Sequence, residues 1–117
     1  MIYFKSKEFD SPDVRGSGVL MDETFLSMLE DARAKANIPF KINSGYRTQE
    51  RNKKVGGVKS SSHTKGLACD ISCKDSRSRF IITTALIDAG FNRIGISKSF
   101  IHVDCDIDKP RNVIWTY

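Results

Sequence analysis

One segment in the first third of the chain has apolar residues at the spacing of an amphipathic helix. Asp22 can cap this helix at its start, and the pattern runs to about Asn37, just before Pro39 ends it. The apolar positions recur at intervals of three or four residues and predict one buried stripe, made of Phe25, Leu26, Leu29, Ala32 and Ala36.

Two further helices are predicted later in the chain. Thr48 can cap a brief helix that runs to Lys54. A longer helix begins at Ser76 or Ser78, and Gly90 stands where the C-terminal glycine of a helix belongs. The buried stripe predicted for the longer helix is made of Phe80, Ile81, Thr84 and Ile87.

Several short stretches predict strands, because they alternate apolar and polar residues or are rich in bulky side chains. They are residues 40–43, 67–73, 93–97, 100–106 and 112–116. Because the helices come first and the strands mostly later, we expect an α+β fold with a small antiparallel sheet and helices packed on one side.

Side chains that commonly bind metals lie on two of these strands and on the loop before one of them. His102, Asp104 and Asp106 share one strand face, because side chains alternate with a period of two. Asp70 stands in an otherwise apolar strand, where a carboxylate is costly to bury unless it is paired or coordinates a cation. His63 precedes it on a loop, and the chain contains only these 2 histidines.

Two histidines and one carboxylate form a complete ligand set for catalytic zinc and leave a fourth position open for water. His63, Asp70 and His102 are therefore a candidate zinc site. A simpler alternative stays open at this point, in which His63 is an ordinary loop residue and His102 and Asp70 form a structural hydrogen bond.

The composition fits one domain that can bury a core without disulfide bonds. The chain has 117 residues, of which 39% are hydrophobic and 28% are charged. Its net charge of +5 favours polyanionic partners, and one group of basic residues invites a nucleic-acid interpretation: Arg47, Arg51, Lys53 and Lys54. Such a module leaves Asp70, Asp104 and Asp106 unexplained, since their carboxylates repel phosphate. We therefore expect no nucleic-acid partner.

No targeting or membrane segment is visible in the sequence. No apolar stretch approaches the roughly 20 residues of a membrane span, and residues 1–5 lack the features of a secretory leader. Cys69, Cys73 and Cys105 are an odd set without a CxxC motif, which is typical of free thiols in a reducing compartment. We expect synthesis in the cytoplasm without a membrane span.

Three motifs together resemble one known family. They are Ser61-x-His63-x-x-Gly66-x-Ala68-x-Asp70-Ile71, Ser44-Gly45-Tyr46-Arg47 and Phe100-Ile101-His102-Val103-Asp104. In this combination the chain is similar to the zinc D-alanyl-D-alanine carboxypeptidase family, which includes peptidoglycan endopeptidases and phage endolysins and shares its fold with the hedgehog signalling domain. The similarity extends from about Phe9 to Asp104, which is most of the chain.

The resemblance implies roles for individual residues. By it, His63, Asp70 and His102 are the ligands of Zn2+, and Arg47 meets an oxygen of the substrate or of the transition state. A guanidinium suits that role because it is always charged and binds carboxylate through two donors. Ser61 either binds a substrate carboxylate or braces the loop, and the alternative for Arg47 is a structural salt bridge.

The resemblance leaves the general base open. Relatives commonly place an acid or a second histidine a few residues before the last zinc histidine, but residues 95–101 contain neither. Asp104 is the nearest acid to His102 and resembles the aspartate of a His-x-Asp subgroup. It either accepts a proton from water or orients His102. We expect Asp106 to lie outside the site.

The implied function is zinc-dependent hydrolysis of peptide bonds in bacterial peptidoglycan, as a D,D-carboxypeptidase or an endopeptidase. The expected partners are peptidoglycan peptide stems, and residues 1–117 are expected to act as one monomeric domain. Without a visible leader, the chain fits a phage lysis enzyme that reaches the cell wall after release, and it fits equally a bacterial protein whose export is not visible in the sequence. The competing interpretation is a non-catalytic, zinc-bearing domain that binds the wall or another protein.

Overall fold

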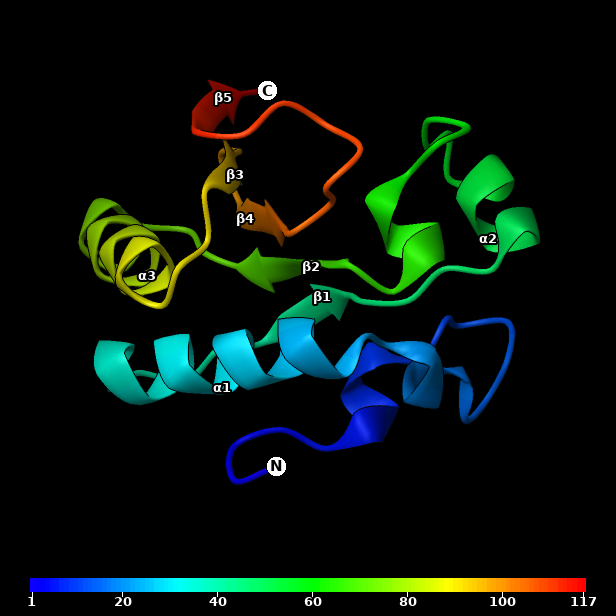
Figure 1. Cartoon of the computed structure of the whole chain (residues 1–117), viewed down its shortest axis with the longest axis horizontal. Helices are drawn as coiled ribbons and strands as arrows, with labels where there is room; N and C mark the ends of the chain where they lie inside the picture. Colours follow the sequence, from blue (N-terminus) through cyan, green and yellow to red (C-terminus); the bar gives the residue numbers. More distant parts are fainter.

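The computed structural model describes residues 1–117 and combines three α-helices with one five-stranded sheet (Figure 1). The helices are α1 (Glu23–Ala36), α2 (Gln49–Lys54) and α3 (Ser76–Asp88). The strands are β1 (Ile42–Ser44), β2 (Ala68–Ser72), β3 (Arg93–Ile96), β4 (Phe100–Asp104) and β5 (Val113–Thr116). Three short 3₁₀ helices, which the sequence did not predict, span Ser6–Phe9, Ser17–Leu20 and Ser62–Lys65. The expected α+β fold is confirmed.

The sheet is mixed, so the prediction of a purely antiparallel sheet is wrong for one strand. The strand order is β1-β2-β4-β3-β5, and every pair is antiparallel except β3 with β5. Both edges of β4 are already occupied by β2 and β3, so the chain that leaves β4 cannot pair with it again. The connection 105–112 therefore steps past β3, and β5 joins its outer edge in the same direction as β3.

Helix α1 forms as its local sequence predicts. The side chain of Asp22 accepts a hydrogen bond from the backbone N–H of Phe25 at 2.9 Å, a cap that contributes about 1 kcal/mol. At the other end Asn37 adopts a left-handed conformation with φ 54° and terminates the helix. Of the predicted stripe, Phe25, Leu29 and Ala32 are fully buried, and Leu26 and Ala36 are partly buried against the core.

Helix α3 forms where predicted, but its buried stripe is different. The residues that it buries are Ile82, Ala85 and Leu86, whereas Phe80 is 70% exposed and Ile87 is 47% exposed. Apolar residues occupy more than one side of this helix, so its own sequence permits several stripes. Packing against α1 and the sheet selects the one observed.

The core lies between helices α1 and α3 and one face of the sheet (Figure 1), and helix α2 contributes no residue to it. Alternation along the strands turns one set of apolar side chains to this face: Cys69, Ile71, Ile94, Ile101 and Val103. The three cysteines are unpaired, and Cys69 is completely buried in this core. None of the helices is both long and apolar enough to cross a membrane.

The opposite face of the sheet carries one transverse row of residues. Asp70 on β2 is paired in register with His102 on β4, His102 with Gly95 on β3, and Gly95 with Trp115 on β5. Neighbouring strands lie about 4.8 Å apart, so the side chains of such a row come into contact. This row is the floor of the candidate site.

Candidate metal centre and cleft

Three structural elements bring His63, Asp70 and His102 together. Asp70 and His102 are direct cross-strand partners on β2 and β4. His63 lies on the 3₁₀ helix Ser62–Lys65, after which Gly66 turns the chain into β2 with a left-handed φ of 71°. A Cβ at Gly66 would lie 2.5 Å from the carbonyl oxygen of Leu20, so this tight turn requires glycine.

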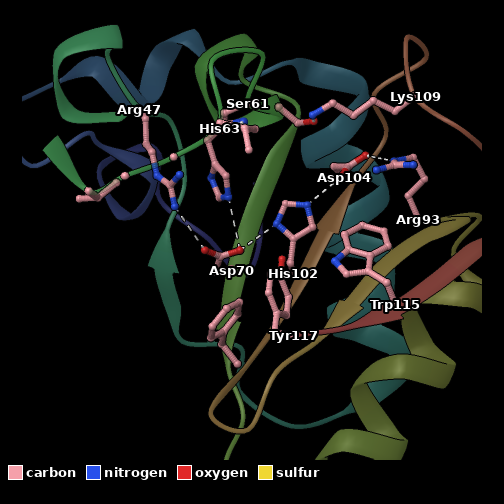
Figure 2. Close-up of a pocket in the computed structure, with 16 residues that line it drawn as sticks. Arg47, Ser61, His63, Asp70, Arg93, His102, Asp104, Lys109, Trp115 and Tyr117 are labelled. Atoms are coloured by element: carbon pink, nitrogen blue, oxygen red, sulfur yellow. Dashed lines mark hydrogen bonds and ion pairs between the residues drawn. The ribbon is translucent and has the colours of Figure 1, made fainter. Parts of the chain in front are cut away.

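The potential ligand atoms converge on one point (Figure 2). His63 Nε2 lies 3.3 Å from Asp70 Oδ1, and His102 Nδ1 lies 2.9 Å from the same oxygen. One ligand atom from each residue lies within 4.8 Å of the others. Tetrahedral zinc with bonds of 2.0–2.1 Å places its ligands roughly 3.3 Å apart. The three side chains could therefore bind a single metal ion.

The outer nitrogen of each imidazole is held by an acceptor. His63 Nδ1 lies 2.8 Å from the carbonyl oxygen of Gly45, and His102 Nε2 lies 2.7 Å from Asp104 Oδ2. A carbonyl oxygen or a carboxylate only accepts, so each outer nitrogen carries the proton and donates. His63 Nε2 and His102 Nδ1 are the nitrogens that face Asp70, and in the neutral imidazoles they could offer their lone pairs to a metal ion, as metal-binding histidines do.

The charge state of Asp70 suits a cation. Burial acts to raise the pKa of Asp70, but in the absence of a metal ion His102 and His63 donate hydrogen bonds to its carboxylate, which outweigh burial and hold the pKa well below its usual range. Asp70 is therefore ionised at neutral pH, with one oxygen toward the histidines and the other toward Arg47.

Both oxygens of Asp104 are occupied by donors. Oδ2 accepts from His102, and Oδ1 accepts from Arg93 Nε at 2.7 Å and from the backbone N–H of Asp106 at 3.1 Å. The carboxylate is only 1% exposed, and Arg93 is fixed further by the carbonyl of Pro110. Burial acts to raise the pKa of Asp104, and the hydrogen bonds from His102 and Arg93 more than compensate and lower it. Asp104 is thus an ionised, fully hydrogen-bonded group beside His102.

Arg47 lines the cleft and is held at three points. Its Nε donates to Ser44 Oγ and its Nη1 to Asn52 Oδ1, both at 3.2 Å. Its Nη2 lies 3.6 Å from Asp70 Oδ2. The structural salt bridge considered for Arg47 is therefore present, and the same contact brings a guanidinium edge to the candidate metal site.

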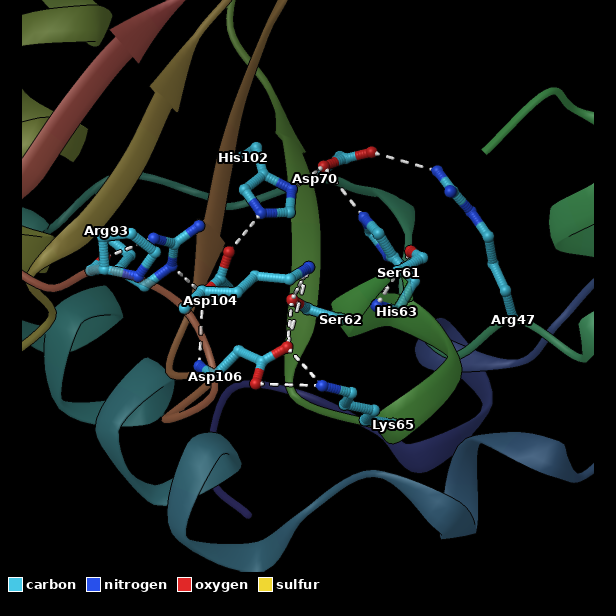
Figure 3. A network of polar contacts seen from close by, with 12 residues as sticks. Arg47, Ser61, Ser62, His63, Lys65, Asp70, Arg93, His102, Asp104 and Asp106 are labelled. Atoms are coloured by element: carbon cyan, nitrogen blue, oxygen red, sulfur yellow. Dashed lines mark hydrogen bonds and ion pairs between the residues drawn. The ribbon is translucent and has the colours of Figure 1, made fainter. Parts of the chain in front are cut away.

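Ser61 and Asp106 support the loop that carries His63. Ser61 is buried, and its Oγ accepts from the backbone N–H of His63 at 3.2 Å, which is the bracing contact considered for it. Asp106 lies outside the ligand group and accepts from Ser62 Oγ at 2.7 Å and from Lys65 Nζ at 2.9 Å (Figure 3). Burial acts to raise the pKa of Asp106, but these partners lower it to about 2.

The three candidate ligands open into a cleft of about 470 Å³. The charged and aromatic lining residues that were not singled out from the sequence include Arg93, Lys109, Trp115 and Tyr117. They come from β3, from the connection 105–112 and from β5 with the residue after it. The only sequence signal was the spacing of Trp115 and Tyr117, which places two aromatic rings on the same face of a strand.

Comparison with known proteins agrees with this geometry. The profile of the family described as Peptidase M15 matches residues 3–104. The chain belongs to this family. Membership in the M15 family, the zinc D-alanyl-D-alanine carboxypeptidases, indicates a metallopeptidase, and the matched region contains His63, Asp70 and His102. Strand β5 lies outside the matched region. No curated protein matches the chain.

Proposed function

We propose that this M15 chain is a zinc peptidase that hydrolyses peptide bonds in bacterial peptidoglycan, with His63, Asp70 and His102 as the zinc ligands. The observation that supports this most is the convergence of two imidazole nitrogens and one carboxylate oxygen at the edge of a cleft. Zinc bound at this point would polarise the carbonyl of the bond to be cut and lower the pKa of an attacking water.

The protein's own residues divide the remaining tasks. Arg47 is anchored by Ser44 and Asn52, so its Nη2 can hold a substrate carboxylate or the developing negative charge on the carbonyl oxygen without being reoriented. Asp104 acts as a positioning residue, because both of its oxygens are already hydrogen-bonded and one of them orients His102. Ser61 holds the backbone of His63 in place.

The proposed substrate is the peptide stem of peptidoglycan. Its carboxylates complement the cations of the cleft, Arg47 on one side and Lys109 on another. The proposal includes action as a monomer on the wall after release from the cell in which the chain is made, as in a phage lysis enzyme. Sedimentation of the zinc-loaded protein tests the monomeric state.

The direct test is product analysis. Purified peptidoglycan is incubated with the zinc-loaded protein, with and without a chelator, and its products are identified by mass spectrometry. Loss of a single terminal residue from the stem identifies a D,D-carboxypeptidase, whereas two peptide fragments identify an endopeptidase.

Substitution of the histidines links that activity to the site. His63→Ala and His102→Ala should each lose bound zinc and wall-cleaving activity, because each variant keeps only two of the three proposed zinc ligands. Asp108→Asn is the control, because the Asp108 side chain is 75% exposed and lies outside the cleft. Full zinc content and full activity in both histidine variants would show that the metal site is elsewhere.

One observation favours a second candidate, a zinc-bearing domain that binds the wall without cutting it. The only carboxylates that line the cleft are Asp70 and Asp104, and donors already engage both. No free carboxylate is therefore in place as a general base. Zinc-dependent retention on purified wall with no released product would favour this candidate over the peptidase.

A further inference from the structure

Strand β5 and the residue after it line one side of the cleft with two aromatic side chains, Trp115 and Tyr117. Both residues lie outside the region that the family profile matches. Trp115 and Tyr117 both face the cleft, and β5 is held beside β3 by the register Gly95–Trp115. The backbone N–H of Tyr117 continues this pairing by donating to the carbonyl of Ile96 at 3.2 Å. Backbone hydrogen bonds therefore hold the segment that carries Trp115 and Tyr117 against the sheet.

The indole of Trp115 occupies a notch that glycine creates. A Cβ at Gly95 would lie 2.7 Å from Trp115 Cε2, so no other residue at position 95 leaves room for the ring. In this notch the indole lies 5.6 Å from the ring of His102, and the guanidinium of Arg93 lies 5.0 Å from its centre. The cation and the packed imidazole fix the indole against the row that contains the candidate metal site.

The side chain of Tyr117 extends from the end of strand β5 toward the candidate metal site. Its ring packs against Phe100 at 5.3 Å between centroids, and its hydroxyl points toward Asp70 and His102 (Figure 2). An ordinary phenol has a pKa of about 10. The hydroxyl is therefore protonated at neutral pH and is a hydrogen-bond donor.

We propose that Tyr117 is a catalytic residue of this site, whose hydroxyl donates a hydrogen bond to the carbonyl oxygen of the peptide bond held in the cleft. The inference rests on the proposed peptidase function. Arg47 reaches the site from the other side of Asp70, so the two donors approach the oxygen from different directions (Figure 2). Tyr117 is 69% exposed and its hydroxyl is free to meet a bound substrate. A neutral donor at this position stabilises the negative charge that develops on the carbonyl oxygen during attack and keeps its own proton throughout. Trp115 positions Tyr117 by filling the notch at Gly95.

The test is Tyr117→Phe in the full, zinc-loaded chain. The substitution keeps the aromatic ring and its packing against Phe100 and removes only the hydroxyl. Loss of one such donor lowers kcat by about 100-fold, and we expect KM to stay within about threefold and the zinc content to be unchanged. Tyr3→Phe makes the same chemical change at a residue that does not line the cleft, and it should keep the kcat of the wild type.

A binding measurement separates catalysis from structure. Trp115 is the only tryptophan of the chain, so its fluorescence reports occupation of the cleft directly. The probes are the peptide product and a phosphinate analogue of the bond that product analysis identifies. Tyr117→Phe should bind the phosphinate about 100-fold more weakly, in parallel with kcat/KM, and should bind the product as the wild type does.

The outcomes distinguish this inference from the proposed function. A wild-type protein that loads zinc and releases no product contradicts the peptidase function, and the inference falls with it. An active wild type beside a Tyr117→Phe variant with unchanged kcat and unchanged phosphinate affinity overturns the role of Tyr117 alone. Equal weakening of product and phosphinate binding would make Tyr117 a substrate-packing residue and would also overturn the inference.

Discussion

Replacement of Asp104 by asparagine should weaken metal binding without removing any metal ligand. All three partners of the Asp104 carboxylate are donors: His102 Nε2–H, Arg93 Nε–H and the backbone N–H of Asp106. An asparagine at this position must therefore place its own NH₂ group against a donor in either orientation of the amide. The hydrogen bond that keeps the proton on His102 Nε2, and the lone pair on Nδ1, is the one at risk.

The size of the effect follows from these contacts. Loss of a carboxylate that orients a metal-binding histidine lowers metal affinity by about 10- to 100-fold, which is about 1.4 to 2.7 kcal/mol. The same substitution leaves Arg93, which is 8% exposed, without its buried carboxylate. Breaking a buried ion pair lowers the free energy of unfolding by about 3 kcal/mol. Asp104→Asn should therefore bind zinc more weakly and unfold at lower urea concentration.

Competition with a chromophoric chelator measures zinc affinity, and kcat is measured separately at saturating zinc. We expect kcat of Asp104→Asn to return to within about tenfold of the wild type once zinc is saturating. Asp108→Asn carries the same change at an exposed site and should leave both quantities unchanged. An unchanged zinc affinity with kcat reduced by 100-fold or more would make Asp104 the general base and refute the positioning role.

Three further perturbations test other parts of the structure. Gly95→Ala should expel the indole of Trp115 from its notch, since the added Cβ would lie 2.7 Å from the ring. A red shift of tryptophan emission would report this displacement. Overpacking at this position should also lower the unfolding free energy by about 1 to 3 kcal/mol. Asp106 has a pKa of about 2 against 3.8 for an unperturbed aspartate, so its ionised form stabilises the fold above about pH 4, and this contribution is lost as the pH falls toward 2. Asp106→Asn should lower the unfolding free energy at pH 7 by about 2 kcal/mol and flatten its dependence on pH between 4 and 2. Urea unfolding measures both effects. Parallel curves of unfolding free energy against pH for variant and wild type would contradict the shifted pKa. Arg47→Lys keeps the positive charge but loses the planar guanidinium that contacts Ser44, Asn52 and Asp70. We therefore expect kcat to fall by at least about tenfold while bound zinc stays constant.

The sequence alone determined those features whose physical cause lies within a few residues. The cap at Asp22 and the apolar spacing that follows it define α1, because capping and helical periodicity act over one or two turns. Alternation along the strand placed His102 and Asp104 on one face, and the cost of burying a lone carboxylate singled out Asp70. The composition of these motifs was enough to nominate the three candidate ligands and to indicate the M15 family.

Only the tertiary structure decided the features that depend on residues far apart in the chain. Helix α3 has apolar residues on several sides, and its contacts with α1 and the sheet selected the buried one. The position of β5 beside β3 depends on which sheet edges remain free once β2 and β3 have paired with β4. Asp104 is enclosed by donors because Arg93 arrives from a neighbouring strand, and Trp115 reaches His102 because the residue between them in the row is a glycine. Such contacts depend on the register between strands, which is set by the packing of the whole sheet and leaves no local trace in the sequence.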